Sequence, residues 1–351
     1  MKRQPWVPGV RLDDANTFGL VAEAEYGCQP ATVSALQETL AEARQHGLMS
    51  WVLGGGSNLL LGPKLSGLCI RPAIRGLRMV EDDGEQVTVD VGAGENWHDL
   101  VRFAIGQGWS GIENLALIPG TVGAAPMQNI GAYAAEVADV AVGVHVMRCE
   151  DLSTAFLPAS ACDFSYRSSL FKGAGRGQYL ITGLRLRLSR HFVPQVGYPD
   201  VALELQRLGC PSPVHPAQVA EAVIRIRRRK LPDWRHQGNA GSFFQNPVIS
   251  RGHFQSLKQE IPDLPGFDSD SGIKIPAARL IDLAGWKGQR EGAIMVWPRQ
   301  PLVLVNTGGG RASEVVMLAR RIVADLEARF AVRLVAEVQP VGLPDAIDLI
   351  K

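Results

Sequence analysis

The hydrophobic pattern of the chain predicts four helices, over residues 30–47, 96–106, 216–230 and 313–330. In the first stretch, Leu36, Leu40 and Ala43 recur on one face, as an amphipathic helix requires. Gly47 follows this stretch as a natural C-cap. Pro232 ends the third stretch, because proline cannot continue a helix.

Other stretches predict strands. Residues 78–91 predict a hairpin, because Asp83-Gly84 supplies a tight turn and valines then occupy every second position from 87 to 91. Trp51-Val52-Leu53 is a short apolar run, which we expect to be a buried strand. The first half of the chain therefore reads as alternating helices and strands.

The length of 351 residues is too great for one ordinary domain and fits two or three. Five prolines without sustained periodicity lie between Pro194 and Pro216, which makes this stretch the best boundary in the chain. We therefore expect a first domain over 1–193, a linker or substrate loop over 194–215, and a second domain over 216–351.

Charge and composition exclude several classes of protein. The 36 Lys and Arg residues almost balance the 35 Asp and Glu residues, so no global field favours nucleic acid or an anionic membrane. The five cysteines are odd in number and contain no C-x-x-C, which argues against a disulfide framework and for a reducing cytoplasm. No histidine pair has metal-ligand spacing, and we expect no metal.

Two segments rich in small residues are candidates for a cofactor site. Residues 54–60 read GGGSNLL directly after the predicted strand at 51–53, where main-chain N–H groups and a hydroxyl are suited to hold a phosphate. Residues 119–133 combine small residues with amide side chains. Neither segment is a dinucleotide fingerprint or a Walker A motif, so a cofactor here requires another fold.

Polar residues in the second half add candidates for chemistry. Ser242 lies between small residues and two phenylalanines, outside any G-x-S-x-G context, so a hydrolase nucleophile is a poor interpretation. Glu337 interrupts LVAEV, an apolar run that we expect to be a strand, where a buried carboxylate is either paired or functional. The basic run over 225–230 is explained as a whole by a solvated helix C-terminus.

The order of the motifs adds a resemblance that covers nearly the whole chain. The series GGGSNLL, IPGTVGAAPMQNIGAY, SYRSSLFK, RRRKLP, GNAGSFFQNP and LVAEV resembles the UDP-N-acetylenolpyruvoylglucosamine reductase family. The resemblance implies a fold of the α+β or α/β class. Its first part would be an FAD-binding domain of the vanillyl-alcohol-oxidase (PCMH) type with lobes over about 1–72 and 73–193. It also implies a separate α/β substrate-binding domain, with the final segment returning to the first lobe.

The resemblance also implies an activity. Members use NADPH and non-covalent FAD to reduce UDP-N-acetylglucosamine enolpyruvate to UDP-N-acetylmuramate in peptidoglycan precursor synthesis, with hydride passing from flavin N5 to C3. Arg167 would stabilise the enolate, Ser242 would donate the proton to C2, and Glu337 would complete the catalytic set. We expect a cytoplasmic monomer.

Binding roles follow from the same resemblance. The residues implied for FAD are Gly54, Gly55, Gly56, Ser57, Asn58, Pro119, Gly120, Val122, Gly123, Ala124, Gln128, Asn129, Gly131, Ala132, Tyr133 and Ile181. The residues implied for the substrate are Tyr198, Arg227, Lys230 and Asn246. Tyr198-Pro199-Asp200 indicates the longer, tyrosine-loop type, whereas Gln339 and Trp297 depart from the family pattern at positions that are often basic or histidine.

Two alternatives remain beside this interpretation. One is an FAD oxidase of a small alcohol on the same fold, although no histidine or cysteine for covalent attachment stands beside GGGSN. The other is a non-catalytic module that binds a UDP-sugar or nucleotide, which would not need Arg167, Ser242 and Glu337 together.

Overall fold

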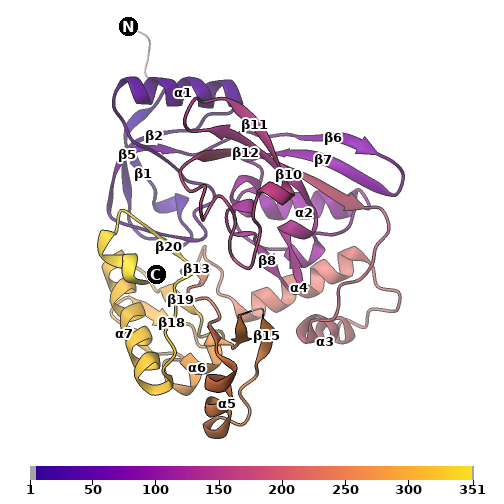
Figure 1. Cartoon of the computed structure of the whole chain (residues 1–351), viewed down its shortest axis with the longest axis vertical. Helices are drawn as coiled ribbons and strands as arrows, with labels where there is room; N and C mark the ends of the chain where they lie inside the picture. Colours follow the sequence, from indigo (N-terminus) through magenta and orange to yellow (C-terminus); the bar gives the residue numbers. More distant parts are fainter. Residues whose placement is uncertain (1–4, 270, 350–351) are drawn as a thin grey trace. The chain divides into compact units, whose positions relative to one another are not determined.

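A computed structural model describes residues 5–269 and 271–349 (Figure 1). The outermost residues of the two predicted domains, 1–4 and 350–351, therefore lie outside the described residues. Two compact units divide the chain. The first comprises residues 1–10, 24–55 and 66–228, and the second comprises 11–23, 56–65 and 229–351.

The first unit contains a small sheet and a larger one. The small sheet has the strand order β1 (Val7–Arg11), β2 (Glu23–Cys28), β5 (Lys64–Ile70) and β3 (Ser50–Val52), and α1 (Val33–Gln45) packs in the same core. Residues Leu36 and Leu40 of α1 are buried in that core, as their spacing predicts. Thr32 caps the helix, because its side chain accepts a hydrogen bond from the N–H of Ala35.

The larger sheet is antiparallel throughout. Its order is β11 (Thr154–Pro158), β10 (Ala141–Arg148), β12 (Tyr179–Ser189), β7 (Gln86–Gly92) and β6 (Leu77–Asp82). The predicted hairpin over 78–91 is confirmed as β6 and β7. Val87, Val89 and Val91 point into a core shared with α2 (Trp97–Gly106), α3 (Pro199–Arg207) and α4 (Pro216–Lys230).

Two expectations for the first unit were wrong. The strand predicted at 51–53 is β3, an edge strand in which Ser50 and Val52 are exposed, and only Leu53 just beyond it is buried. The proline-rich stretch contains the helix α3, because proline is tolerated at the first helical position and Val201 and Leu205 then pack into the core.

The boundary between the units also differs from the expected one. Residues 194–228 belong to the first unit, so α4 does not open the second unit as predicted. The apolar face of α4, which includes Val219, Val223 and Ile226, is buried in the core of the larger sheet. Burial of this face explains why the helix belongs there.

The second unit is built around a four-stranded sheet. Its order is β13 (Gly238–Ser242), β19 (Val303–Asn306), β18 (Ile294–Val296) and β17 (Arg290–Glu291). A three-stranded sheet contains β14 (Val248–Ile249), β16 (Gly272–Lys274) and β15 (Phe267–Ser269). The helices α5 (Arg251–Glu260), α6 (Ala277–Leu283) and α7 (Ala312–Phe330) contribute to one core.

The segment after α7 returns to an early part of the chain. Strand β20 (Gln339–Val341) pairs in parallel with β4 (Leu59–Leu61), which directly follows the glycine-rich motif. This pairing places the end of the LVAEV motif beside Asn58, because the N–H of Gln339 donates to the Asn58 carbonyl over 3.0 Å.

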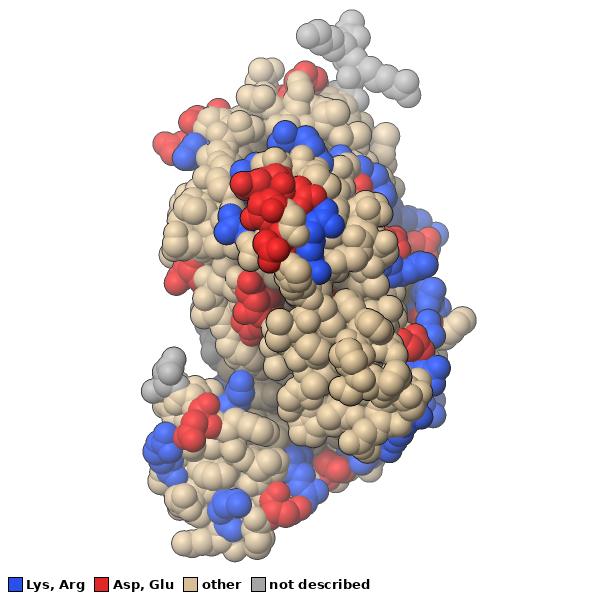
Figure 2. Space-filling model, turned by 90° about the vertical axis from the view of Figure 1, so that its right-hand side faces the viewer, with Lys and Arg blue, Asp and Glu red and all other residues tan. Residues whose placement is uncertain are grey.

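The distribution of charged side chains on the surface agrees with the nearly equal numbers of acidic and basic residues (Figure 2). On the face shown in Figure 2, acidic and basic side chains are interspersed, and the densest acidic group has basic side chains beside it. At the tip of the β6–β7 hairpin, the Arg190 guanidinium pairs with Asp82.

Candidate active site

Within the first unit, the two glycine-rich segments meet. A side-chain carbon on Gly54 would lie 3.0 Å from Ala124 Cβ and 3.1 Å from Thr121 Oγ1. A side-chain carbon on Gly55 would collide with the main chain of Gly120. The structure therefore brings together the two segments in which the sequence predicts cofactor-binding residues.

The glycine-rich segment 54–60 is divided between the units, and its residues from Gly56 onward belong to the second unit. Gly56 has φ +61°, and a side-chain carbon there would lie 2.0 Å from the Ala15 carbonyl oxygen. The Asn58 side chain donates to the Glu337 carbonyl over 3.2 Å. Ser57 lies between Gly56 and Asn58 in the sequence. Asn58, predicted to bind FAD, thus holds the main chain of a predicted catalytic residue.

The segment 119–133 folds into a 3₁₀ helix, Val122–Gln128, followed by a tight hairpin. Predicted FAD residues Val122, Gly123, Ala124 and Gln128 lie in the helix, Pro119 and Gly120 precede it, and Gly131 and Ala132 form β8 (Gly131–Ala132). Ala132 pairs with Ala135 of β9 (Ala135–Glu136), so Tyr133 and Ala134 alone form the turn. Both have positive φ, +50° and +65°, which is costly for residues other than glycine.

Asn129 and Ile181 are buried inside the first unit. The Asn129 amide donates to Glu136 Oε2 over 2.6 Å, and its oxygen accepts from the N–H of Ala138. These bonds give its side chain a role in holding the loop. Ile181 lies in β12 opposite Val146 and packs in the core of the larger sheet.

Two guanidinium groups lie near Tyr133 in the first unit. Arg167 has φ +55°, and its Nη2 donates to the Gly131 carbonyl over 2.8 Å. Arg227 Nε is shielded from solvent and has no hydrogen-bond partner among the described residues. Burial lowers the pKa of Arg227 below its usual value; Tyr133 opposes this shift, and the positive charge of Arg167 adds to it.

Tyr198 lies at the N-terminus of α3 and is 43% exposed. Its ring packs edge-to-face against Tyr133, with ring centroids 5.3 Å apart. The structure therefore groups Tyr133, Arg167 and Arg227 by electrostatic interaction and joins Tyr198 to the group through Tyr133.

In the second unit, Ser242 and Glu337 lie on neighbouring segments. The N–H of Glu337 donates to the Phe243 carbonyl over 2.8 Å, and Phe244 pairs with Ala336. Glu337 does not lie in the predicted strand, and its side chain is half-buried rather than fully buried. The reason is that the segment makes a single bridge at Ala336 and then bends.

Ser242 ends β13 directly after a bulge. Gly241 has φ +69° in this bulge, and its N–H donates to the Asn239 side chain. The Asn239 amide also donates to the Pro232 and Gln237 carbonyls. Sequence reasoning missed Asn239, although it lies inside the GNAGSFFQNP motif, because the partners that make it a support are set by the fold.

Gln339 and Trp297, which depart from the family pattern, each donate a side-chain hydrogen bond to a main-chain carbonyl. Gln339 Nε2 donates to the Glu337 carbonyl over 3.1 Å, and Trp297 Nε1 donates to the Lys230 carbonyl over 3.0 Å. Asn246, predicted to bind substrate, accepts a hydrogen bond from the N–H of Ala277 at the start of α6. Gln339 and Trp297 therefore hold the main chain of two predicted site residues.

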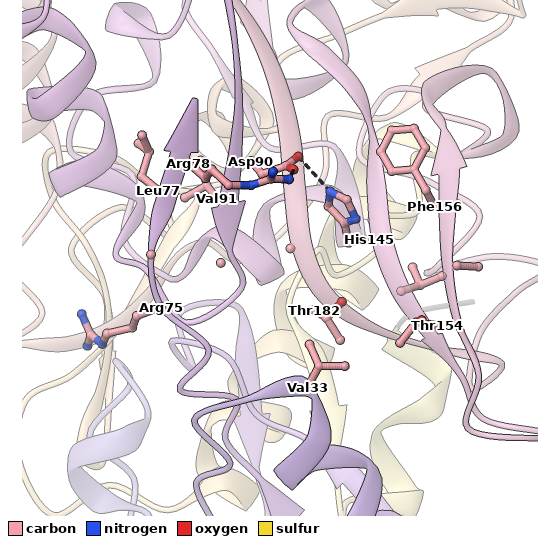
Figure 3. A pocket seen from close by; sticks show the side chains of 15 residues that line it. Val33, Arg75, Leu77, Arg78, Asp90, Val91, His145, Thr154, Phe156 and Thr182 are labelled. Carbon is pink, nitrogen blue, oxygen red and sulfur yellow. Dashed lines mark hydrogen bonds and ion pairs between the residues drawn. The ribbon is translucent and has the colours of Figure 1, made fainter. Parts of the chain in front are cut away.

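A separate groove of about 680 Å³ lies on the outer face of the larger sheet (Figure 3). Asp90 is one of its lining residues and accepts hydrogen bonds from Arg185, Arg78 and His145. The Arg185 hydrogen bond above all, with those from His145 and Arg78, holds the pKa of Asp90 well below the usual carboxyl range although burial opposes the shift. The groove's lining does not include Arg167.

The described part of the chain lacks two other kinds of feature. No helix within it combines the length and apolar character that a bilayer crossing demands. Within the same residues, no group of three or more His, Cys, Asp or Glu side chains is arranged to hold a metal ion.

Comparison with known proteins identifies the family. Residues 24–151 match the FAD binding domain model, and residues 233–341 match the model of the UDP-N-acetylenolpyruvoylglucosamine reductase C-terminal domain. This confirms the predicted order of an FAD-binding domain and a separate C-terminal domain.

Relatives that match this chain over nearly its whole length support the same family. The chain is 42% identical over 340 residues to the UDP-N-acetylenolpyruvoylglucosamine reductase of Paraburkholderia xenovorans, covering 96% of this chain and 98% of the relative. It is 44% identical over 347 residues to that of Burkholderia multivorans, covering 96% and 97%. The crystal structure of the Thermus caldophilus reductase is similar with a TM-score of 0.66, 26% identity, and coverage of 95% and 98%. The chain therefore belongs to the UDP-N-acetylenolpyruvoylglucosamine reductase family.

Proposed function

We propose that the protein reduces UDP-N-acetylglucosamine enolpyruvate to UDP-N-acetylmuramate with NADPH and non-covalently bound FAD, as a cytoplasmic monomer in peptidoglycan precursor synthesis. Relatives that carry the name of this reductase along nearly their whole length support the activity. The five free cysteines support a reducing compartment. Family membership favours this activity over the alcohol oxidase and the non-catalytic binding module.

The residues of the glycine-rich segments fit FAD. Gly55 approaches Gly120 so closely that no side chain fits between them, which leaves main-chain groups to face a ligand. Residues 54–58 and 119–133 would hold the cofactor, with Ile181 beside it. When bound, FAD supplies the two-electron chemistry that passes reducing equivalents from NADPH to the substrate.

The partly buried guanidinium of Arg227 is the observation that carries the proposal. Its Nε is shielded from water and has no hydrogen-bond partner among the described residues, and the group feels the positive charge of Arg167, so it is destabilised until an anion arrives. The proposed substrate has both a carboxylate and a diphosphate, and arginine binds either group with paired hydrogen bonds. Nothing in a small neutral alcohol would compensate this charge.

Each predicted residue has a role suited to its chemistry. Arg167 stabilises the negative charge that develops on the substrate carboxylate as the enolate forms. Ser242 donates a proton to C2, and the bulge at Gly241 fixes the main chain that carries this hydroxyl. Glu337 completes the catalytic set, and hydrogen bonds from Asn58 and Gln339 to its carbonyl hold its main chain.

Substrate binding is assigned to four residues of the same pattern. Lys230 and Arg227 bind the diphosphate as cations, and Asn246 binds a polar group of the sugar. Tyr198 is exposed at the start of α3, where its hydroxyl is available to a substrate phosphate.

The Ser242→Ala variant tests the proposal, because the reaction divides into two half-reactions. We expect anaerobic bleaching of the flavin by NADPH to proceed at a near-normal rate, since that step needs no proton at C2. Reoxidation by the enolpyruvyl nucleotide should slow by roughly 10²–10⁴-fold, the usual contribution of a positioned general acid. Stopped-flow absorbance follows both steps.

A matched control is Ser256→Ala, which removes an exposed hydroxyl from α5. Both half-reactions of this variant should equal those of the wild type. Normal reoxidation in Ser242→Ala would remove the serine from the acid role. A wild-type protein that binds no flavin, or that oxidises NADPH independently of the enolpyruvyl nucleotide, would remove the proposed activity itself.

A further inference from the structure

Asn114 joins two segments that are far apart in the sequence. It lies in a 3₁₀ turn, Glu113–Leu115, and is 2% exposed. Its Nδ2 donates to the Tyr133 carbonyl over 2.8 Å and to the Gln195 carbonyl over 2.9 Å. One amide group therefore uses both of its N–H bonds to hold the cofactor-side turn and the segment that leads into Tyr198.

The orientation of this amide is fixed by its partners. Both neighbours are carbonyl oxygens, which accept hydrogen bonds only, so the NH₂ group rather than the oxygen must face them. The opposite atom, Oδ1, is buried without a hydrogen-bond partner among the described residues. Leaving a buried acceptor unpaired destabilises the folded protein. The two hydrogen bonds donated by Nδ2 are thus present together with an unfavourable contribution from Oδ1.

The Tyr133 turn is itself strained. Tyr133 and Ala134 are consecutive residues with positive φ in a two-residue hairpin, a position in which asparagine and glycine are preferred. The Asn114 hydrogen bond to the Tyr133 carbonyl counteracts this strain. In this turn conformation the Tyr133 ring packs edge-to-face against Tyr198, and this contact is favourable.

We propose that Asn114 is a positioning residue that sets the place of Tyr198 by clamping Gln195 to Tyr133. This inference rests on the proposed substrate role of Tyr198. Only two residues separate Gln195 from Tyr198, so fixing the Gln195 carbonyl restricts where Tyr198 lies and where α3 begins. The aromatic contact then holds the ring on the turn that carries the predicted FAD residues.

The clamp lowers the entropic cost of substrate binding. Residues 193–195 are exposed and Val196 is half-buried, so few packing contacts restrict this segment. A segment that is already held near its bound position loses less freedom when the ligand arrives. Removing the clamp should therefore weaken substrate binding while leaving the reacting groups unchanged.

The test replaces Asn114 with leucine, which keeps the branched shape of the side chain and has no hydrogen-bonding atoms. In Asn114→Leu we expect the KM for the enolpyruvyl nucleotide to rise about tenfold, which corresponds to about 1.4 kcal/mol, with kcat within twofold of the wild type. FAD content should be unchanged. In a second measurement, chymotrypsin should cleave after Phe192 several times faster than in the wild type.

A matched control is Thr39→Val in α1, which also replaces a buried polar side chain by an apolar one of similar shape and removes a hydrogen bond to the Ala35 carbonyl. This control should change neither KM nor the cleavage rate. If Asn114→Leu does not fold, Asn114→Ser is measured in the same way.

An unchanged KM and an unchanged cleavage rate in a folded, FAD-containing variant would overturn the clamp. So would an equal loss in kcat and in kcat/KM, which indicates general damage instead of repositioning. Cleavage is measured without substrate, so it tests the clamp even if the wild type fails to reduce the enolpyruvyl nucleotide and the proposed function falls.

Discussion

A side-chain carbon on Gly55 would lie 2.5 Å from the Cα atom of Gly120. The two main chains thus touch at a point where both residues are predicted to bind FAD. A side chain at Gly55 must therefore push one segment away from the other.

Gly55→Ala should therefore reduce both stability and flavin retention. We expect the variant to elute from gel filtration with less than a tenth of the wild-type flavin, because relieving the 2.5 Å clash displaces the segment that holds the cofactor. Gly106→Ala is the control, since Gly106 ends α2 and has open space around its Cα. Full flavin content in Gly55→Ala would contradict the close packing of the two segments.

Ala134→Gly should stabilise the protein. Alanine in the left-handed region costs about 1–2 kcal/mol, whereas the added chain entropy of glycine costs about 0.5–1 kcal/mol. The free energy of unfolding measured in urea should rise by about 0.5–1 kcal/mol. The neighbouring Ala132 has no positive φ, so Ala132→Gly should lower it. Loss of stability in Ala134→Gly would show that the turn is not strained at this residue.

Tyr198→Phe should weaken binding of the enolpyruvyl nucleotide more than binding of NADPH. The ring contact with Tyr133 survives in the variant, so only the hydrogen bond of the hydroxyl to the substrate is lost. Titration of each ligand against flavin absorbance gives both dissociation constants. Tyr179→Phe, which changes a half-buried tyrosine of β12, is the control. Equal losses for the two ligands would remove Tyr198 from the substrate site.

Asp90→Asn should lower stability at neutral pH and change its acid dependence. The pKa of Asp90 is lower in the folded than in the unfolded chain, because Arg185 donates to its carboxylate. Its stabilisation is thus fully present above the ordinary carboxyl pKa of about 4 and is lost as the pH falls from there toward the depressed value.

At pH 7 we expect the variant to lose about 2 kcal/mol of unfolding free energy, the usual worth of hydrogen bonds to a charged group. The difference from the wild type should shrink as the pH is lowered from about 4 to 2. Glu81→Gln, on the exposed strand β6, should show no such convergence. A difference that stays constant over this range would contradict the ion-pair explanation.

The local pattern was sufficient to predict the hairpin β6–β7 and the helix α4, because each depends on its own periodicity. It was not sufficient for α3. This helix has nine residues and begins at a proline, and it lies in a stretch whose several prolines are typical of a loop. It also failed for β3, because exposure depends on whether a strand lies at the edge or in the centre of its sheet.

The supports of the candidate site lie beyond sequence reasoning for a different reason. The amide of Asn114 contacts Gln195, and that of Asn58 contacts the carbonyl of Glu337, so each bond joins residues brought together only by the fold. Motif order identified the residues assigned to chemistry. Hydrogen bonds across the sequence determine how their main chains are held.

Helix α4 runs without interruption through the basic run at 225–230. Arg227 and Lys230, both assigned to the substrate, are three positions apart on it and are separated by roughly 4.5 Å along the helix axis. This spacing is set by the rise per residue of a continuous helix. One inserted residue between them would turn Lys230 by about 100° around the axis, so the register of a single helical turn fixes the angle between the two side chains.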